Sequence, residues 1–181
     1  MICGTSAGAI NAAALACNAD QFDTAVEGIA QVWENFRAEQ VYRADAFGVV
    51  RSGARWLTML SLGWALRRWR RSDPRSLLDN SPLAELLARV IPFERLPALL
   101  NEGHLNALAV TASSYSSGNH VTFCQTARPF EPWLRSQRTA VPSIISDTHL
   151  LASSAIPFVF PAQPLDIADV SEWFGDGSMR Q

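Results

Sequence analysis

The sequence predicts one α/β domain that spans residues 1–181. Segments with helical periodicity alternate with strand-like apolar runs, which is typical of a sheet covered by helices. A G-x-S-x-G pattern at residues 4–8 marks the expected junction of a strand and a helix. No internal repeat or low-complexity linker divides the chain, and 181 residues with 48% hydrophobic content suffice for one core.

The first expected element is a strand that turns sharply into a helix. The turn reads Gly4-Thr5-Ser6-Ala7-Gly8, and small residues continue to Ala16. This is the pattern of a nucleophile elbow, which lifts a serine hydroxyl clear of the sheet. We expect a Cβ at either glycine to collide with the turn, and we expect the helix N-terminus to favour an oxyanion near the serine. A packing turn rich in glycine and alanine, without chemistry, is the alternative interpretation.

Four further helices are expected, over about 20–37, 81–91, 93–100 and 147–155. The first of them is amphipathic, with apolar residues at helical spacing. Ser81 as N-cap and Pro82 at the first helical position open the second. Gly103 is a C-cap signal after the third. The fourth begins at a cap formed by Ser146 or Asp147.

Strand-like runs cover 105–111, 120–125, 158–160 and 172–174. The first two are separated by the turn-forming residues 115–119, which predicts a β-hairpin. The last two are short and aromatic, and they lead into a loop that contains Asp176 and Gly177. We therefore expect an apolar strand to deliver this aspartate to an end of the sheet.

The serine of an elbow needs a base, because a hydroxyl is a poor nucleophile at neutral pH. One alternative is His149 with an acid upstream, in the chain order of an α/β-hydrolase esterase. The segment around His149 has a helical pattern, however, and His104 and His120 lie at strand boundaries, so we interpret all three as structural or surface residues. The other alternative is the Asp176 carboxylate acting directly on Ser6, although Asp-Gly is also a common turn dipeptide.

Composition excludes several classes of function. The three cysteines and three histidines are scattered and lack metal-ligand spacing, so we expect neither a metal nor another cofactor. The cysteine pattern suits a reducing compartment, and we expect a cytoplasmic protein, with export left open because the chain begins close to the elbow. Nucleic acid is not an expected partner, since the formal net charge is −2 and no reading motif is present.

One basic segment, 51–75, holds seven arginines and a single acid. Its apolar stretch 56–66 is too short to span a bilayer, which takes about twenty residues. A tryptophan-bearing apolar run flanked by arginines fits a helix in a lipid headgroup region. The expected lipid contacts are Trp56, Trp64, Trp69, Arg67 and Arg68. A helix packed on the domain with solvated arginines is the alternative.

Five segments, in order, resemble the patatin-like phospholipase family: Gly4–Asn11, Ser76–Leu83, Ala109–Ala112 with Gly118 and Phe123, His149–Pro157 with Phe160-Pro161, and Gly175-Asp176-Gly177. The resemblance implies a three-layer α/β/α sandwich that hydrolyses lipid or phospholipid acyl esters. It implies a dyad in which Ser6 is the nucleophile and Asp176 the base. The histidines are then bystanders, and the reaction needs no metal.

The chain departs from the family pattern in two places. The family's glycine-rich oxyanion loop and most of the first strand belong upstream of the elbow, and both ends of the chain look cut. Ser178 follows Asp176-Gly177 where the family usually has glycine or alanine. Losing one oxyanion donor costs about 10²–10³ in rate, so we expect this chain alone to be inactive or very weakly active. A pseudoenzyme or other lipid-surface binding module remains the alternative function.

Overall fold

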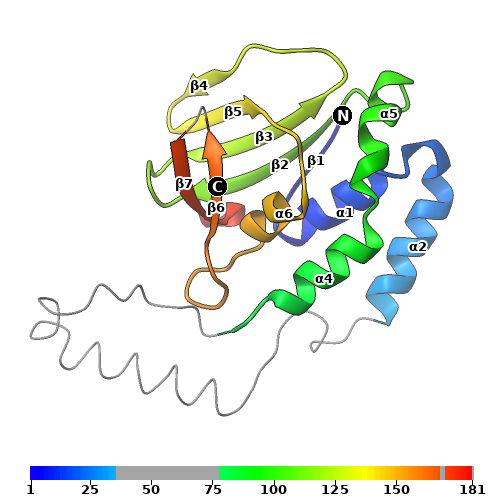
Figure 1. Ribbon diagram of the computed structural model, residues 1–181, viewed down its shortest axis with the longest axis horizontal. Coiled ribbons are helices and arrows are strands. Elements are labelled where there is room, and N and C mark those ends of the chain that lie inside the picture. The colour runs from blue at the N-terminus through cyan, green and yellow to red at the C-terminus, as the bar shows by residue number, and fades with distance from the viewer. Residues whose placement is uncertain (36–77, 168–169, 181) are drawn as a thin grey trace, which may run out of the picture.

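The computed structural model of the chain describes residues 1–35, 78–167 and 170–180 (Figure 1). A mixed seven-stranded sheet lies beside a group of helices. The strands are β1 (Ile2–Thr5), β2 (Ala107–Ser114), β3 (His120–Thr126), β4 (Trp133–Arg135), β5 (Arg138–Pro142), β6 (Gln163–Ile167) and β7 (Val170–Asp176). The helices are α1 (Ala7–Ala16), α2 (Phe22–Glu34), α4 (Ser81–Val90), α5 (Leu96–Asn101) and α6 (Asp147–Ser153), with 3₁₀ turns η1 (Ala19–Gln21), η3 (Phe93–Arg95) and η4 (Gly177–Arg180).

The long strand β2 organises the sheet, whose order is β4-β5-β3-β2-β7-β6. Antiparallel β3 occupies one edge of β2 along almost its whole length. Two strands share the other edge: β1 runs parallel to β2 and ends with Thr5 opposite Thr111, and β7 runs antiparallel and ends with Asp176 opposite Ala112. The carboxyl ends of β1 and β7 therefore meet head to head on neighbouring residues of β2.

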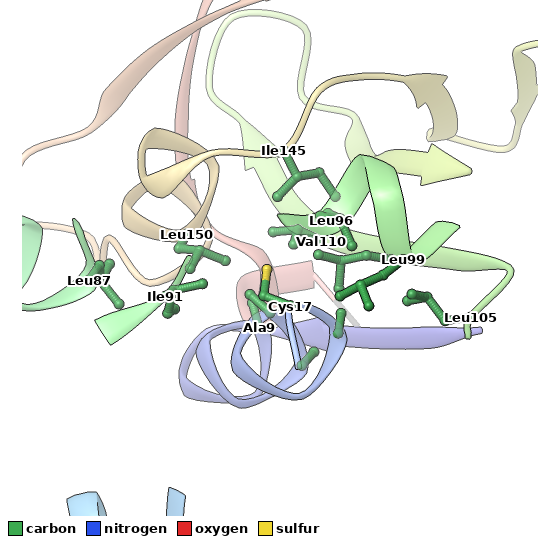
Figure 2. Close-up of a cluster of buried hydrophobic side chains, with 14 of the residues drawn as sticks. Ala9, Cys17, Leu87, Ile91, Leu96, Leu99, Leu105, Val110, Ile145 and Leu150 are labelled. Atoms are coloured by element: carbon green, nitrogen blue, oxygen red, sulfur yellow. The ribbon is translucent and has the colours of Figure 1, made fainter. Parts of the chain in front are cut away.

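The helices α1, α4, α5 and α6 pack on one face of the sheet (Figure 1). Side chains alternate between the faces of a strand, and Leu108 and Val110 of β2 both belong to this helical core. Figure 2 shows Val110 among the side chains of the helices. Four alanines of α1, Ala9, Ala12, Ala13 and Ala16, are buried and let that helix lie close to the sheet. A second cluster continues the core, and in it the ring centroids of Phe123 and Phe174 lie 5.3 Å apart.

The opposite face of β2 carries Thr111 and Ser113, and η4 lies against it. The hydrogen bond between His120 Nε2 and the carbonyl oxygen of Gly177 joins η4 to the neighbouring strand β3. The chain thus passes from the helical face to the other face immediately after Asp176. This crossing decides which way the aspartate side chain points.

Most expected elements are present. The elbow helix, the hairpin of β2 and β3, and the strand that leads to Asp176 are confirmed. The amphipathic segment forms η1 and α2 up to Glu34. Helix α6 begins with a capping box at Ser146, and Gly103 takes a positive φ of 82° after α5, as a C-cap glycine should.

Two local predictions were wrong. Asn80, not Ser81, occupies the cap position of α4; Ser81 is the first helical residue, and its backbone N–H donates to Asp79 Oδ1 at 3.0 Å. Residues 158–160 form a turn in which Phe158 has a φ of 67°, and not the expected strand. The short apolar run is explained by the pocket that Val159 and Phe160 line, described below, and not by burial in the sheet.

Three strands were not expected: β4, β5 and β6. All three residues of β4 are exposed, so this strand has no apolar alternation to reveal it. The turn between β4 and β5 consists of Ser136 and Gln137, both at positive φ, where asparagine and glycine are the usual signal. β6 contains Pro164, which argues against a central strand and agrees with its place at the sheet edge.

Candidate active site

Ser6 lies between the end of β1 and the start of α1, as the elbow pattern predicts. Its backbone has φ 55° and ψ −130°, a conformation that non-glycine residues rarely adopt and that costs about 1–3 kcal/mol. The elbow is closed by a hydrogen bond of 2.9 Å from the Ala9 amide to the Ser6 carbonyl oxygen. The turn thereby fixes the backbone from which the serine side chain extends.

The two glycines of the elbow are needed to different degrees. A Cβ on Gly4 would lie 2.2 Å from the carbonyl oxygen of Gly8, and because that oxygen is a backbone atom, only a change in the turn could relieve the collision. A Cβ on Gly8 would meet nothing within 4 Å. The expectation that both flanks exclude a side chain is therefore right for Gly4 and wrong for Gly8.

Asp176, the last residue of β7, is buried with 3% of its surface exposed. The hydroxyl of Ser6 donates a hydrogen bond of 2.8 Å to its Oδ2. This contact follows from the sheet: Thr5 and Asp176 oppose Thr111 and Ala112, so the residue that follows β1 lies beside the residue that ends β7. The two residues predicted from sequence as a dyad are in direct contact.

The carboxylate of Asp176 is fixed from its other side. Ser178 donates two hydrogen bonds to Oδ1, one of 2.8 Å from its amide and one of 2.7 Å from its hydroxyl. The Asp176 amide donates to the Ala155 carbonyl oxygen at 2.9 Å. Gly177 leaves no room for a side chain, since a Cβ there would lie 2.3 Å from the carbonyl oxygen of Thr111. Ser178, considered from sequence only as a tolerable departure, is thus part of the site.

The histidines have other partners. His149 accepts a hydrogen bond of 3.2 Å from the Ser146 amide at Nδ1 and packs edge-on against Phe123. Burial lowers its pKa to about 4, against a smaller opposing effect of the Asp147 charge. His104 pairs with Glu102 at 3.4 Å on the surface. Within the described hydrogen bonds, no histidine contacts Ser6 or Asp176.

One histidine lies closer to the site than expected. His120 bonds the Gly177 carbonyl oxygen, directly after Asp176, from the face of the sheet opposite the helices. A carbonyl oxygen only accepts, so Nε2 of His120 is the donor. From sequence, we interpreted His120 as a structural or surface residue. Nothing in the neighbouring sequence reveals that β3 brings it against Gly177, the residue after Asp176.

A pocket of about 840 Å³ opens beside Ser6. It lies between α1, α2, α4 and the turn after α6, and no charged side chain is among the described residues that line it. Apolar side chains dominate, among them Ile10, Ile29, Leu83, Leu87, Val159 and Phe160. The wall formed by α2 is tied to α1 by a 2.9 Å hydrogen bond from Trp33 Nε1 to Asn11 Oδ1. Such a pocket suits an apolar chain next to the serine hydroxyl.

Other sequence predictions fall outside this geometry. Within the described ranges, no three histidine, cysteine or acidic side chains form a group that could hold a metal ion. None of the described helices has the length and apolarity to cross a membrane. The segment 51–75 lies outside the described residues, and with it the expected lipid contacts Trp56, Trp64, Trp69, Arg67 and Arg68.

Sequence reasoning also missed Ser153. Its hydroxyl accepts a hydrogen bond from the Ser6 amide, although from sequence Ser153 was only one residue of the segment His149–Pro157 that resembles the family.

A family model described as patatin-like phospholipase matches residues 1–181, the whole chain. No curated protein and no solved structure matched the chain.

Proposed function

The chain belongs to the patatin-like phospholipase family of lipid acyl hydrolases, and we propose that it cleaves lipid acyl esters with a Ser6–Asp176 dyad. Its central mixed sheet with packed helices is consistent with the α/β/α sandwich of that family. The observation that carries the proposal is the 2.8 Å hydrogen bond from Ser6 Oγ to Asp176 Oδ2. A serine that lies on a strained elbow and donates a hydrogen bond to a buried carboxylate is arranged for nucleophilic catalysis.

The reaction proceeds in two halves. In the first, Asp176 accepts the hydroxyl proton while Ser6 Oγ attacks the ester carbonyl carbon, and the C–O bond to the alcohol breaks as the proton passes to the leaving oxygen. The product is an acyl-enzyme on Ser6. In the second half, Asp176 takes a proton from water, the water oxygen attacks the acyl carbon, and Ser6 leaves with the proton restored.

The oxyanion of each tetrahedral intermediate lies near the start of α1. Ala7 and Gly8 carry the first amides of that helix, which an α-helix leaves without intrahelical partners. The helix dipole favours negative charge at this end. The family resemblance implies further donors in a glycine-rich loop, and removal of one oxyanion donor typically lowers the rate by about 10²–10³.

The substrate class follows from the pocket beside the nucleophile. Its volume of about 840 Å³ lies within the ordinary range of ligand pockets. Because the described lining lacks charged side chains, it suits the acyl chain and not the polar part of the lipid. We further propose that the basic, tryptophan-bearing segment 51–75 contacts the membrane surface transiently, so that a cytoplasmic protein acts at the periphery of the membrane.

Hydrolysis of p-nitrophenyl esters of increasing acyl length tests the proposal. We expect measurable turnover that disappears in Ser6→Ala and in Asp176→Asn. His104→Ala is the matched control, because His104 lies on the surface and its side chain pairs only with Glu102 among the described contacts. Turnover that survives Ser6→Ala would refute the proposal. An unsubstituted protein that folds but hydrolyses no ester would favour a lipid-binding pseudoenzyme.

A further inference from the structure

The hydroxyl of Ser153 joins three parts of the site. It accepts a hydrogen bond of 2.9 Å from the Ser6 amide and donates one of 2.6 Å to the carbonyl oxygen of Thr111. Ser153 is the last residue of α6 and is completely buried. One side chain therefore connects the elbow, the central strand β2 and the helical layer.

The amide that Ser153 binds belongs to the strained residue of the elbow. A backbone conformation such as that of Ser6 persists only when the surrounding structure holds it in place. The Gly4–Gly8 contact restrains the elbow from one side. The Ser153 hydroxyl restrains it from the other, and removing that hydroxyl would leave a polar N–H without its partner.

Thr111 extends the connection to the second member of the dyad. Its carbonyl oxygen accepts the Ser153 hydrogen bond and is also the atom that a Cβ on Gly177 would meet at 2.3 Å. Gly177 follows Asp176 directly and packs closely on this carbonyl. The same backbone atom of β2 is thus adjacent to the anchor of the nucleophile and to the turn that carries the base.

We propose that Ser153 is a positioning residue, which holds the Ser6 elbow and the Asp176 turn in register through the Thr111 carbonyl. This inference rests on the proposed function. Ser153 does not line the pocket, whereas the next residue, Ser154, does. Ser153 therefore acts on the orientation of the Ser6 hydroxyl and not on the binding of substrate.

The experiment compares Ser153→Ala with Ser113→Ala. Ser113 is also a buried serine, but its Oγ has no hydrogen-bond partner among the described residues, so its removal breaks no bond. Amide hydrogen exchange at Ser6, followed by NMR, reports on the bridge without any need for turnover. The kcat and KM for a long-chain p-nitrophenyl ester report on its consequence for the reaction.

In Ser153→Ala we expect Ser6 amide exchange to accelerate by about tenfold or more. We expect kcat to fall on the order of ten- to a hundredfold with KM nearly unchanged, because the nucleophile is displaced while the pocket is intact. Ser113→Ala should match the parent in all three quantities. If Ser153→Ala does not fold, Ser153→Cys keeps the size of the side chain with weaker hydrogen bonds, and it should show the same changes at smaller amplitude.

Unchanged Ser6 amide exchange in the variant would overturn the inference. So would a change confined to KM, because that would place Ser153 in substrate binding. A parent that hydrolyses no ester would count against the proposed function alone. In that case the exchange of the Ser6 amide decides for or against the Ser153 bridge.

Discussion

The hydroxyl of Ser6 lies 2.8 Å from the carboxylate of Asp176, although 170 positions separate the two residues in sequence. Their strands approach each other end to end on one edge of β2 and stop at its neighbouring residues Thr111 and Ala112. The pair is therefore placed by strand register, and it depends on the three-residue contact between β7 and β2. Changes that shift β7 should separate the pair without touching either side chain.

Ser178→Ala tests how firmly the carboxylate must be held. The substitution removes the 2.7 Å hydroxyl bond to Asp176 Oδ1 and leaves the 2.8 Å amide bond in place. We expect kcat for ester hydrolysis to fall by about two- to tenfold, because one of two restraints on Oδ1 remains. Ser178→Thr keeps a hydroxyl at the position and should retain more activity; equal activity in all three proteins would show that the hydroxyl bond is dispensable.

Gly4→Ala and Gly8→Ala separate the two glycines of the elbow. The added methyl group at Gly4 would lie 2.2 Å from the Gly8 carbonyl oxygen, and we expect a loss of about 1–3 kcal/mol in the free energy of unfolding. Gly8→Ala meets nothing within 4 Å inside a helix, so its stability should stay the same or rise by up to about 1 kcal/mol. Urea unfolding measures both, and equal destabilisation would contradict the elbow geometry.

Gly28→Leu tests the pocket as the acyl site. Gly28 lies on α2, lines the pocket and has open space where a side chain would begin. A leucine there should fill part of the cavity, so we expect the preferred acyl chain among p-nitrophenyl esters to shorten. Gly28→Ala is the control, because one methyl group takes little of that space. An unaltered length profile in Gly28→Leu would place the acyl chain elsewhere.

Burial of His149 makes stability dependent on pH. Its pKa is about 4 in the folded protein and about 6.5 in the unfolded chain, so below pH 6.5 the unfolded state binds the extra proton first. Stability is complete above that value and falls as the pH drops towards 4. Between pH 7 and 5 the parent should lose about 2 kcal/mol of unfolding free energy through this group.

The matched variant for that measurement is His149→Gln. Glutamine is an ordinary capping-box residue at this position of a helix, so the start of α6 keeps a partner for the Ser146 amide. Urea unfolding at the two pH values should show a smaller loss in the variant than in the parent. An equal loss would mean that His149 does not titrate as its burial requires.

The sequence predicted the elbow and the β2–β3 hairpin, because each has a local signature, and it offered Ser6 and Asp176 as candidate site residues. Glycines and small residues mark the turn at Ser6, and Asp176-Gly177 follows an apolar strand. The contact between the two residues could not be derived from spacing, since it arises from the register of β1 and β7 on β2. The family resemblance supplied it instead.

Other parts of the site have no local signature. Ser153 contacts the amide of Ser6, which is far away in sequence. Ser178 reaches the Asp176 carboxylate only because the turn between them brings its hydroxyl back to that side chain. His120 reaches the aspartate loop only through strand pairing. The edge strands β4 and β6 lacked alternation or contained proline, so their places in the sheet depend on long-range pairing and not on their composition.

Covalent labelling of the serine tests the central claim most directly. Ser6 Oγ should attack the phosphorus of a long-chain alkyl fluorophosphonate and displace fluoride, and peptide mass spectrometry should find the phosphonyl group on that residue. The labelling rate in Asp176→Asn should fall by about 10²–10⁴, the usual contribution of a positioned base. Labelling at another residue, or at an undiminished rate in Asp176→Asn, would contradict a dyad of Ser6 and Asp176.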